Sequence, residues 1–162
     1  MARKGQGGRK LVGVISDTHG LLRPEVLDVF QGVDLILHAG DIGTPEVLQE
    51  LRSLAPVVAI RGNNDKGHWA NGIPESEVAL VGGAQIYLLH DLKEIELIPA
   101  AAGFHAVISG HSHRPSVGKK DGVLFLNPGS AGPRRFKLPI SVAHLTVSGW
   151  NLSAKLIELQ VR

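Results

Sequence analysis

Short apolar runs alternate with helix-like segments over the first third of the chain. The runs "LVGVIS" (11–16), "DLILHA" (34–39) and "PVVAI" (56–60) are rich in Val, Ile and Leu, as is typical of strands buried on both faces. Between them, "PEVLDVF" (24–30) and "TPEVLQELRSL" (44–54) place Pro at a first helical position and apolar residues at helical spacing. This β-α-β-α-β order predicts a parallel sheet with right-handed crossovers.

The second half of the chain predicts mostly strands. Gly82-Gly83 separates "SEVALV" from "AQIYLLH", which favours a tight hairpin, and a helix is expected near "DLKEIELIPAAAG" (91–103). Further strands are predicted at 105–109, 115–120, 123–127, 140–147 and 150–159. Partial alternation in the last two indicates antiparallel pairing. We therefore predict an α/β fold of two packed mixed β-sheets flanked by helices, a four-layer α-β-β-α sandwich.

Length and composition limit the fold to one compact domain, which we place at 11–162. The chain has 162 residues, of which 43% are apolar and 20% charged. The opening ten residues (1–10) form a basic, Gly-rich segment that we expect to be a flexible tail, with an anion-binding arm as the alternative. No apolar run is long enough to span a bilayer or to form a signal peptide, so a cytoplasmic protein without membrane association is expected.

Charge and cysteine content narrow the possible chemistry. The formal net charge of +2 is small and does not imply nucleic-acid binding. Cysteine is absent, which excludes disulfides and thiolate metal sites. Any metal site must therefore use nitrogen and oxygen ligands.

Five of the apolar runs end at side chains that can bind a metal ion. These residues are Asp17 and His19; Asp41; Asn63, followed by Asn64 and Asp65; His90; and His111 with His113. In open α/β sheets the carboxyl ends of the strands converge on one crevice, so we expect these side chains to cluster there.

Two divalent cations held about 3.5 to 4 Å apart can bind a hydroxide and present it to phosphorus. His111 and His113, two residues apart in extended chain, can approach such a pair from one loop, although "HSH" alone suits a surface turn equally well. Asp41 is the best candidate for a bridging carboxylate. The positive charge of two divalent cations exceeds the negative charge of two carboxylates and one hydroxide. The site therefore keeps a net positive charge that attracts a phosphate group. The mixed ligands do not select one metal.

The order of these motifs resembles that of the calcineurin-like metallophosphoesterases. The motifs are D-T-H (17–19), G-D (40–41), G-N-N-D (62–65), a lone His90 and G-H-S-H (110–113). The segment from Leu11 to the end, including N-P-G-S (127–130), resembles the small, cap-less bacterial and archaeal phosphodiesterases of that superfamily.

The resemblance implies two metal ions per chain and assigns their ligands. The first would be held by Asp17, His19, Asp41 and His113, and the second by Asp41, Asn63, His90 and His111. Mn is the metal that members typically use, with Fe, Zn, Ni or Co as alternatives. The implied fold is the one predicted above.

Two residues depart from patterns common in the superfamily. Many relatives carry His where this chain has Asn64, and an amide can donate a hydrogen bond to phosphate but cannot deliver a proton. We therefore expect reliance on metal charge and on good leaving groups, with Asp65 orienting Asn64 or capping its loop. Asp91 stands where Gly is usual, which would narrow the pocket or add negative charge.

Several other polar residues have two interpretations each. His38 is a buried core histidine or a partner of a metal ligand. His68 and Trp69 belong to a surface loop or line the pocket mouth, and Arg134 with Arg135 is solvated or steers a phosphate.

The sequence thus predicts a metal-dependent phosphoesterase, in the first place a phosphodiesterase, in which a dinuclear centre activates a bridging hydroxide for in-line attack. The ligands do not discriminate phosphodiesters from monoesters or cyclic nucleotides. The alternative is a protein-interaction scaffold of the retromer-subunit type with a vestigial or weakly active metal site. Homo-oligomers are an expectation from the resemblance.

Overall fold

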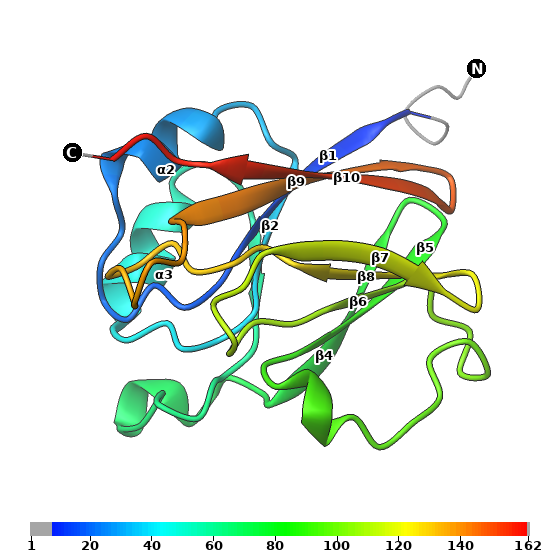
Figure 1. The fold of residues 1–162 in the computed structure, drawn as a ribbon, viewed down its shortest axis with the longest axis horizontal. Coiled ribbons are helices and arrows are strands. Elements are labelled where there is room, and N and C mark those ends of the chain that lie inside the picture. The colour runs from blue at the N-terminus through cyan, green and yellow to red at the C-terminus, as the bar shows by residue number, and fades with distance from the viewer. Residues whose placement is uncertain (1–7, 162) are drawn as a thin grey trace.

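Two five-stranded mixed sheets pack face to face in the computed structural model, which describes residues 8–161 (Figure 1). The first sheet has the order β10-β9-β1-β2-β3, and the second has the order β4-β5-β6-β8-β7. The strands of the first are β1 (Lys10–Ile15), β2 (Leu35–His38), β3 (Val57–Ala59), β9 (Ser141–Ser148) and β10 (Asn151–Glu158). Those of the second are β4 (Ser76–Val81), β5 (Ala84–Leu89), β6 (Ala106–Ile108), β7 (Ser116–Lys120) and β8 (Val123–Asn127). The predicted α/β fold with two packed mixed sheets is confirmed.

The predicted parallel start and the predicted hairpin are both confirmed. Strand β1 pairs in parallel with β2, and β2 with β3, whereas β9 pairs antiparallel to β1. Strands β4 and β5 form the antiparallel hairpin around Gly82-Gly83. Because β5, β6 and β8 run parallel to one another, the second sheet also has a carboxyl edge at which several strands end.

The main core lies between the two sheets. Val14 and Leu37 of the first sheet belong to the same buried cluster as Ile86, Leu88 and Ile108 of the second. A second cluster covers the outer face of the first sheet, where α2 (Pro24–Val29) and α3 (Pro45–Arg52) pack. Burial on both faces explains why β1 and β2 of this sheet read as continuous apolar runs.

The outer face of the second sheet lacks the predicted long helix. Of 91–103, only Leu92–Glu94 is helical, as the single 3-10 turn η2, and Ile95 is already extended. Pro99 disfavours helical geometry at Ile98, so a helix that begins at Leu92 has too few residues to continue beyond one turn. The segment instead lies over the sheet through Ile95, which packs against Leu89, Val107 and Val123.

The ends of the chain and the connections add little to the core. Residue Lys10 of the predicted tail begins β1, while residues 1–7 lie outside the described residues. A further 3-10 turn, η1 (His68–Ala70), follows β3. Its Trp69 is partly buried against the second cluster, on the outer face of the first sheet, whereas His68 is exposed. None of the helices within 8–161 has the length and hydropathy needed to cross a bilayer.

Candidate metal centre

The loops that follow β1, β2, β3, β5 and β6 meet at one edge of the sandwich. Backbone N–H groups of Asp17 and His19 donate to the carbonyls of Gly40 and Asp41, both at 2.9 Å, so the first two loops run side by side. Gly110 N–H donates to the His90 carbonyl at 2.9 Å and joins the two loops of the second sheet. The strand-end residues singled out by sequence therefore come from five segments of chain but lie in one region.

The backbone of this region is held in an unusual conformation. Of the seven non-glycine residues with positive φ in the described part of the chain, five are predicted ligands. Their φ angles lie between 47° and 71°, and the residues are Asp17, His19, Asp41, His111 and His113. The left-handed region is disfavoured for L-residues, and such conformations concentrate at functional sites, where the surrounding structure holds them.

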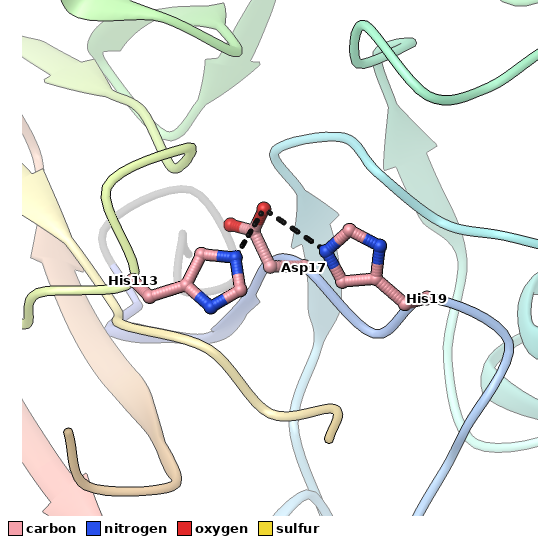
Figure 2. A group of neighbouring side chains, drawn as sticks. All are labelled: Asp17, His19 and His113. Carbon is pink, nitrogen blue, oxygen red and sulfur yellow. Dashed lines mark ion pairs between the residues drawn. The ribbon is translucent and has the colours of Figure 1, made fainter. Parts of the chain in front are cut away.

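Asp17 is the centre of the first group of ligand atoms. Its Oδ1 lies 3.4 Å from His113 Nε2 and 3.7 Å from His19 Nε2, and Figure 2 shows both rings directed at this carboxylate. Its Oδ2 accepts hydrogen bonds from Ser16 Oγ at 2.7 Å and from the backbone N–H of His111 at 3.0 Å. The Asp17 side chain is fully buried. The carboxylate is therefore fixed through Oδ2, which leaves Oδ1 facing the two histidines.

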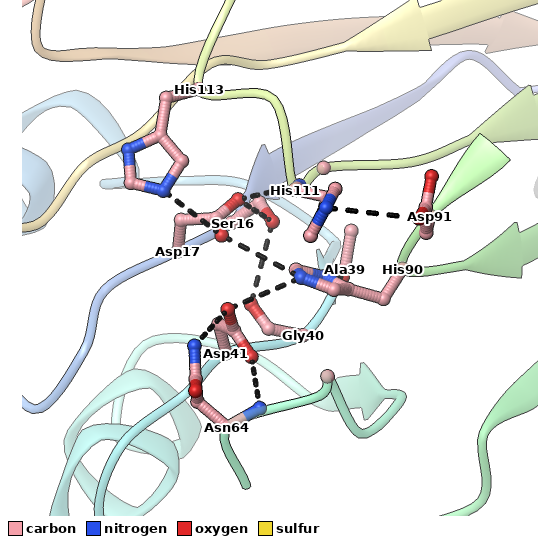
Figure 3. Close-up of polar contacts among 12 residues, drawn as sticks. Ser16, Asp17, Ala39, Gly40, Asp41, Asn64, His90, Asp91, His111 and His113 are labelled. Carbon is pink, nitrogen blue, oxygen red and sulfur yellow. Dashed lines mark hydrogen bonds and ion pairs between the residues drawn. The ribbon is translucent and has the colours of Figure 1, made fainter. Parts of the chain in front are cut away.

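Asp41 and His90 complete a second group with Asp17 (Figure 3). His90 Nε2 lies 3.2 Å from Asp41 Oδ2 and 3.8 Å from Asp17 Oδ1. The other ring nitrogen, Nδ1, is 2.7 Å from the Ala39 carbonyl, to which it must donate because a carbonyl only accepts. A neutral His90 thus presents its Nε2 lone pair to the two carboxylates, as a metal-binding histidine does.

The donor atoms at this edge fit a divalent cation. In each group, Asp17-His19-His113 and Asp17-Asp41-His90, one ligand atom per residue lies within 4.8 Å of the others. Among the described residues, Asp17 Oδ1, His19 Nε2 and His90 Nε2 are buried without a hydrogen-bond partner. Unsatisfied buried polar atoms are costly, and here they converge from different loops on shared positions. Nitrogen and oxygen donors of this kind bind first-row divalent metals.

The pKa values of these groups show how strongly negative the site is. Burial lowers the pKa of His90, but the Asp41 carboxylate and the charge of Asp17 outweigh it and raise the value to about 9. The pKa of His19 is also raised, chiefly by Asp17. Burial raises the pKa of Asp17, yet His113 and His19 hold it well below its usual range. Burial also raises the pKa of Asp41, but hydrogen bonds from His90 and Asn64 outweigh it and lower the value. Both carboxylates are therefore ionised at neutral pH, and the site attracts positive charge, whether protons or a cation.

Asn63 and His111 occupy the outer side of the same region. Both are exposed, and both line a cleft of about 890 Å³ together with His90 and Asp91. The ring of His111 stands edge-on to that of His90 with centroids 5.2 Å apart, and its Nε2 is 3.7 Å from Asp91 Oδ2. The structure brings these two residues to the rim of the centre, while the atoms of the two compact groups come from the other five predicted ligands.

Asn64 and Asp65 have different surroundings. The side chain of Asn64 donates to Asp41 Oδ2 at 3.0 Å, and its backbone N–H donates to Asp41 Oδ1 at 2.9 Å (Figure 3). The buried Asp65 carboxylate accepts from the backbone N–H groups of Ile42, Gly43 and Gly62 at 2.9 to 3.0 Å. Asp65 thereby ties the loop after β3 to the loop that carries Asp41.

His38 connects two ligand loops from within the core. Its Nδ1 accepts from Gly40 N–H at 3.1 Å, so the neutral ring donates through Nε2 to Thr18 Oγ1 at 3.0 Å, which in turn donates to the Ile42 carbonyl. Burial lowers the pKa of His38 to about 4, so the ring stays neutral. The two interpretations from sequence meet here, because His38 is a buried, hydrogen-bonded histidine that also holds the residues beside Asp17 and Asp41.

Two glycines are required by close approach. A Cβ at Gly62 would collide with the side chain and backbone nitrogen of Asp41. A Cβ at Gly110 would lie 2.6 Å from Asp17 Oδ2 and would collide with Ser16 Oγ. The glycines of the G-N-N-D and G-H-S-H motifs therefore allow the loops to approach the carboxylates.

Sequence reasoning did not assign roles to several supporting residues. Ser16 donates to the Asp17 carboxylate, Ser130 Oγ donates to the Asp17 carbonyl at 3.1 Å, and Asn127 Nδ2 donates to the Gly110 carbonyl at 3.0 Å. Asn127 and Ser130 belong to the N-P-G-S motif, which was the available signal for them. Ser16 had none beyond its place next to Asp17.

Comparison with known proteins agrees with this geometry. Residues 11–149 match the calcineurin-like phosphoesterase superfamily domain. A probable metallophosphoesterase of Methanothermobacter thermautotrophicus is 38% identical over 160 residues, covering 91% of this chain and 92% of that protein. An archaeal phosphodiesterase of known structure has a TM-score of 0.74 at 22% identity, covering 91% of this chain and 99% of that one. Zinc-bound Vps29 of Entamoeba histolytica has a TM-score of 0.69 at 26% identity, covering 91% and 98%.

The match to the superfamily domain extends over most of the chain, and the archaeal relative matches along almost its full length. Membership implies binding of divalent metal and phosphoester hydrolysis, for which the clustered Asp and His side chains provide candidate ligands. The chain belongs to the calcineurin-like phosphoesterase superfamily.

Proposed function

We propose that the protein is a phosphodiesterase that uses two divalent metal ions, Mn in the first place, held at the carboxyl edge of the two sheets. The observation that carries this proposal is the convergence of unpartnered, buried Asp17 Oδ1, His19 Nε2 and His90 Nε2 on shared positions. Fe, Zn, Ni or Co would suit the same donors. The likeness to the archaeal phosphodiesterase and to zinc-bound Vps29 supports the choice of chemistry.

The proposed ligand sets follow the superfamily pattern. Asp17, His19, Asp41 and His113 would hold one ion, and Asp41, Asn63, His90 and His111 the other. Asp41 Oδ2 lies 3.8 Å from His19 Nε2 and 3.2 Å from His90 Nε2, so it reaches a histidine of each set, as a bridging carboxylate must. Asn63 and His111 would close the second set from the rim of the cleft.

Bound divalent ions would supply Lewis acidity and a hydroxide nucleophile near neutral pH, for attack in line with the leaving group. The protein's own groups fix the geometry. Ser16 and the His111 backbone N–H hold Asp17, the Ala39 carbonyl holds His90, and Asp65 holds the loop of Asn64 against that of Asp41. Asp65 therefore acts in our proposal as a positioning residue.

Asn64 is the proposed contact to a phosphate oxygen. Its exposed amide already donates to Asp41 Oδ2 and stands next to the proposed Asn63 ligand. An amide cannot protonate a leaving group, so we expect efficient cleavage of aryl esters and slow cleavage of alkyl esters.

The test is hydrolysis of bis(para-nitrophenyl) phosphate with added Mn²⁺, compared with para-nitrophenyl phosphate and with the Asp41→Asn variant. We expect faster turnover of the diester than of the monoester and loss of activity in the variant. Faster monoester hydrolysis would contradict the diester assignment. Equal rates in wild type and variant would contradict the metal-dependent mechanism.

The alternative is a scaffold of the Vps29 kind with a vestigial site. The likeness in fold favours it, but here all seven proposed positions carry residues able to bind metal, which favours the enzyme. A cytoplasmic location and self-association remain predictions.

A further inference from the structure

One loop next to the metal centre has features that neither the fold nor the ligand geometry requires. It runs from Ala131 to Pro139, between β8 and β9, and its two ends are pinned together by the bridge between Ser130 and Ile140. Such compact surface loops with closed ends are frequently functional. In Figure 1 it is the orange segment that precedes β9, beside the blue loop after β1.

The base of this loop is attached to the first ligand loop. Gly132 N–H donates to the Asp17 carbonyl at 3.2 Å, and Ala131 N–H donates to the Ser16 carbonyl at 3.1 Å. A Cβ at Gly132 would collide with the Thr18 carbonyl, and Arg23 Nη2 donates to the Gly132 carbonyl at 3.1 Å. The loop is therefore anchored at the ligand residue Asp17.

The tip of the loop exposes a phenyl ring among positive charges. Phe136 is 86% exposed, the largest exposure among the large apolar side chains of the described residues. Arg134, Arg135 and Lys137 flank it and are exposed as well. Arg134 Nη1 donates to the Leu138 carbonyl at 3.2 Å within the loop. Arg135 lies three residues after Gly132, whose N–H donates to the Asp17 carbonyl, so the anchored base of the loop keeps Arg135 near the first ligand loop.

The conformation of Phe136 costs stability that no packing contact offsets. Its φ is 56°, in a tight turn in which Leu138 N–H donates to the Arg135 carbonyl at 3.1 Å. Gly, Asn or Asp is favoured at such a position, and a bulky residue there is an outlier. A strained, exposed aromatic residue that does not contribute to the core points to a contact with a ligand.

We propose that this loop recognises the substrate, with Phe136 stacking on a nucleobase and Arg135 contacting a phosphate oxygen, so that the substrate class is a phosphodiester of a nucleotide. The inference rests on the function proposed above. Every base offers a flat face to an aromatic ring, and arginine binds phosphate through charge and hydrogen bonds. Contact with a lipid surface is less well supported, because one phenyl ring is little apolar surface with which to hold a protein of 17.2 kDa at a bilayer.

The test compares two aryl diesters with the same leaving group: the para-nitrophenyl ester of thymidine monophosphate, which carries a base, and methyl para-nitrophenyl phosphate, which does not. The readout is the ratio of their kcat/KM values with Mn²⁺. Phe136→Gly should lower this ratio about tenfold, as expected for the loss of one stacked base. Arg135→Gln should lower kcat/KM for both substrates alike, by about fivefold, the effect of one unit charge at contact distance in water.

Two controls separate recognition from structure. Phe136→Gly removes backbone strain together with the ring, so its melting temperature should equal or exceed that of the wild type while the ratio falls. Trp150→Ala removes another exposed aromatic ring, 67% exposed between β9 and β10 at the opposite edge, and should leave the ratio unchanged. An unchanged ratio in Phe136→Gly, or an equal fall in Trp150→Ala, would overturn the inference.

A binding measurement keeps this test separate from that of the proposed function. If the wild type cleaves neither ester, the proposed function fails, and the loop is then tested by binding of fluorescein-labelled oligothymidylate to Asp41→Asn protein. Weakening by about tenfold on adding Phe136→Gly supports the inference, and unchanged affinity overturns it. Binding to phosphatidylglycerol vesicles that Phe136→Gly abolishes, with unchanged nucleotide affinity, would overturn it in favour of a membrane contact.

Discussion

The two edges of the sandwich place different residue types at backbone positions with positive φ. At the carboxyl edge, positive φ angles are adopted by Asp17, His19 and Asp41, which are buried or partly buried and crowd their charges together. At the opposite edge the turns between strands rely mainly on glycine, with positive φ at Gly82 and Gly149, while the turn between β7 and β8 pairs Asp121 with Gly122. Glycine adopts the left-handed conformation at little cost in free energy, whereas the same conformation is less favourable for Asp and His.

The contrast shows which edge is built for binding and which for connection. Turns at the glycine edge need only to reverse the chain, and they rest on one another through the hydrogen bond from Gly83 N–H to the Gly149 carbonyl at 2.8 Å. The carboxyl edge keeps side chains whose pKa values are displaced and whose polar atoms are unpartnered. Such a region is stabilised by a ligand that satisfies these atoms, here the proposed cations.

The largest effect is expected from Asp41→Asn. It removes the charge that faces both His19 and His90 while keeping the shape of the side chain. Activity on an aryl diester should fall at least about a hundredfold, because even residues that only support metal ligands contribute about 10- to 100-fold. Steady-state kinetics at saturating Mn²⁺ measures this. A similar substitution at the glycine edge, Asp121→Asn in the turn between β7 and β8, should leave activity unchanged, and a matching loss there would contradict the division between the edges.

Gly110→Ala should destabilise the protein by about 1 to 3 kcal/mol, because the added methyl group meets the side chains of Ser16 and Asp17. It should also weaken Mn²⁺ binding, since Asp17 must move. Urea unfolding and calorimetric titration measure the two effects. Gly118→Ala in β7 is the matched control, as nothing lies within 4 Å of the added carbon. Equal free energies of unfolding in the two variants would show that the carboxyl edge is not tightly packed.

The pH dependence of the metal-free protein should report His90. Its folded pKa is raised to about 9 from 6.5, so the stabilisation it provides is fully present below pH 6.5 and is lost as the pH rises through about 9. Unfolding in urea with EDTA should therefore give a free energy that declines over this window, and Mn²⁺ should reverse the decline as it replaces the proton. His90→Asn should flatten the curve, whereas His105→Gln, at the start of β6, should not. If the free energy of unfolding of His90→Asn still declined over this pH window, another group would be responsible for the decline.

The smallest effect is expected at the glycine edge itself. Gly149 has a φ of 63° and open space around its Cβ position, so Gly149→Ala should cost about 1 kcal/mol through backbone strain alone. Metal affinity should not change. A thermal melt with and without Mn²⁺ measures both. If Gly149→Ala altered the stabilisation by Mn²⁺, the two edges would be coupled through the sheets.

Much of this organisation could be predicted from the sequence, because buried strands leave a strong local pattern. Continuous apolar runs located β1, β2 and β3, and the polar residues directly after them marked the edge where Asp17 and Asp41 lie. The helix expected at 91–103 was wrong, because Pro99 limits helical geometry before it and Ile95 packs in an extended conformation on the second sheet.

Contacts between distant segments were beyond reach of the sequence. The three hydrogen bonds to Asp65, the role of His38 between two loops and the support of Asp17 by Ser130 all depend on tertiary approach. Positive φ at His111 and His113 is likewise imposed by the fold rather than by local preference. The hydrogen bond from Gly132 N–H to the Asp17 carbonyl likewise joins positions more than a hundred residues apart.

Anomalous diffraction from crystals grown with Mn²⁺ would locate the proposed metal ions directly. We expect two strong peaks per chain, about 3.5 to 4 Å apart as in other two-metal sites, one beside Asp17, His19 and His113 and the other beside Asp41 and His90. A single peak, or peaks at any other surface of the protein, would contradict the proposed two-metal centre.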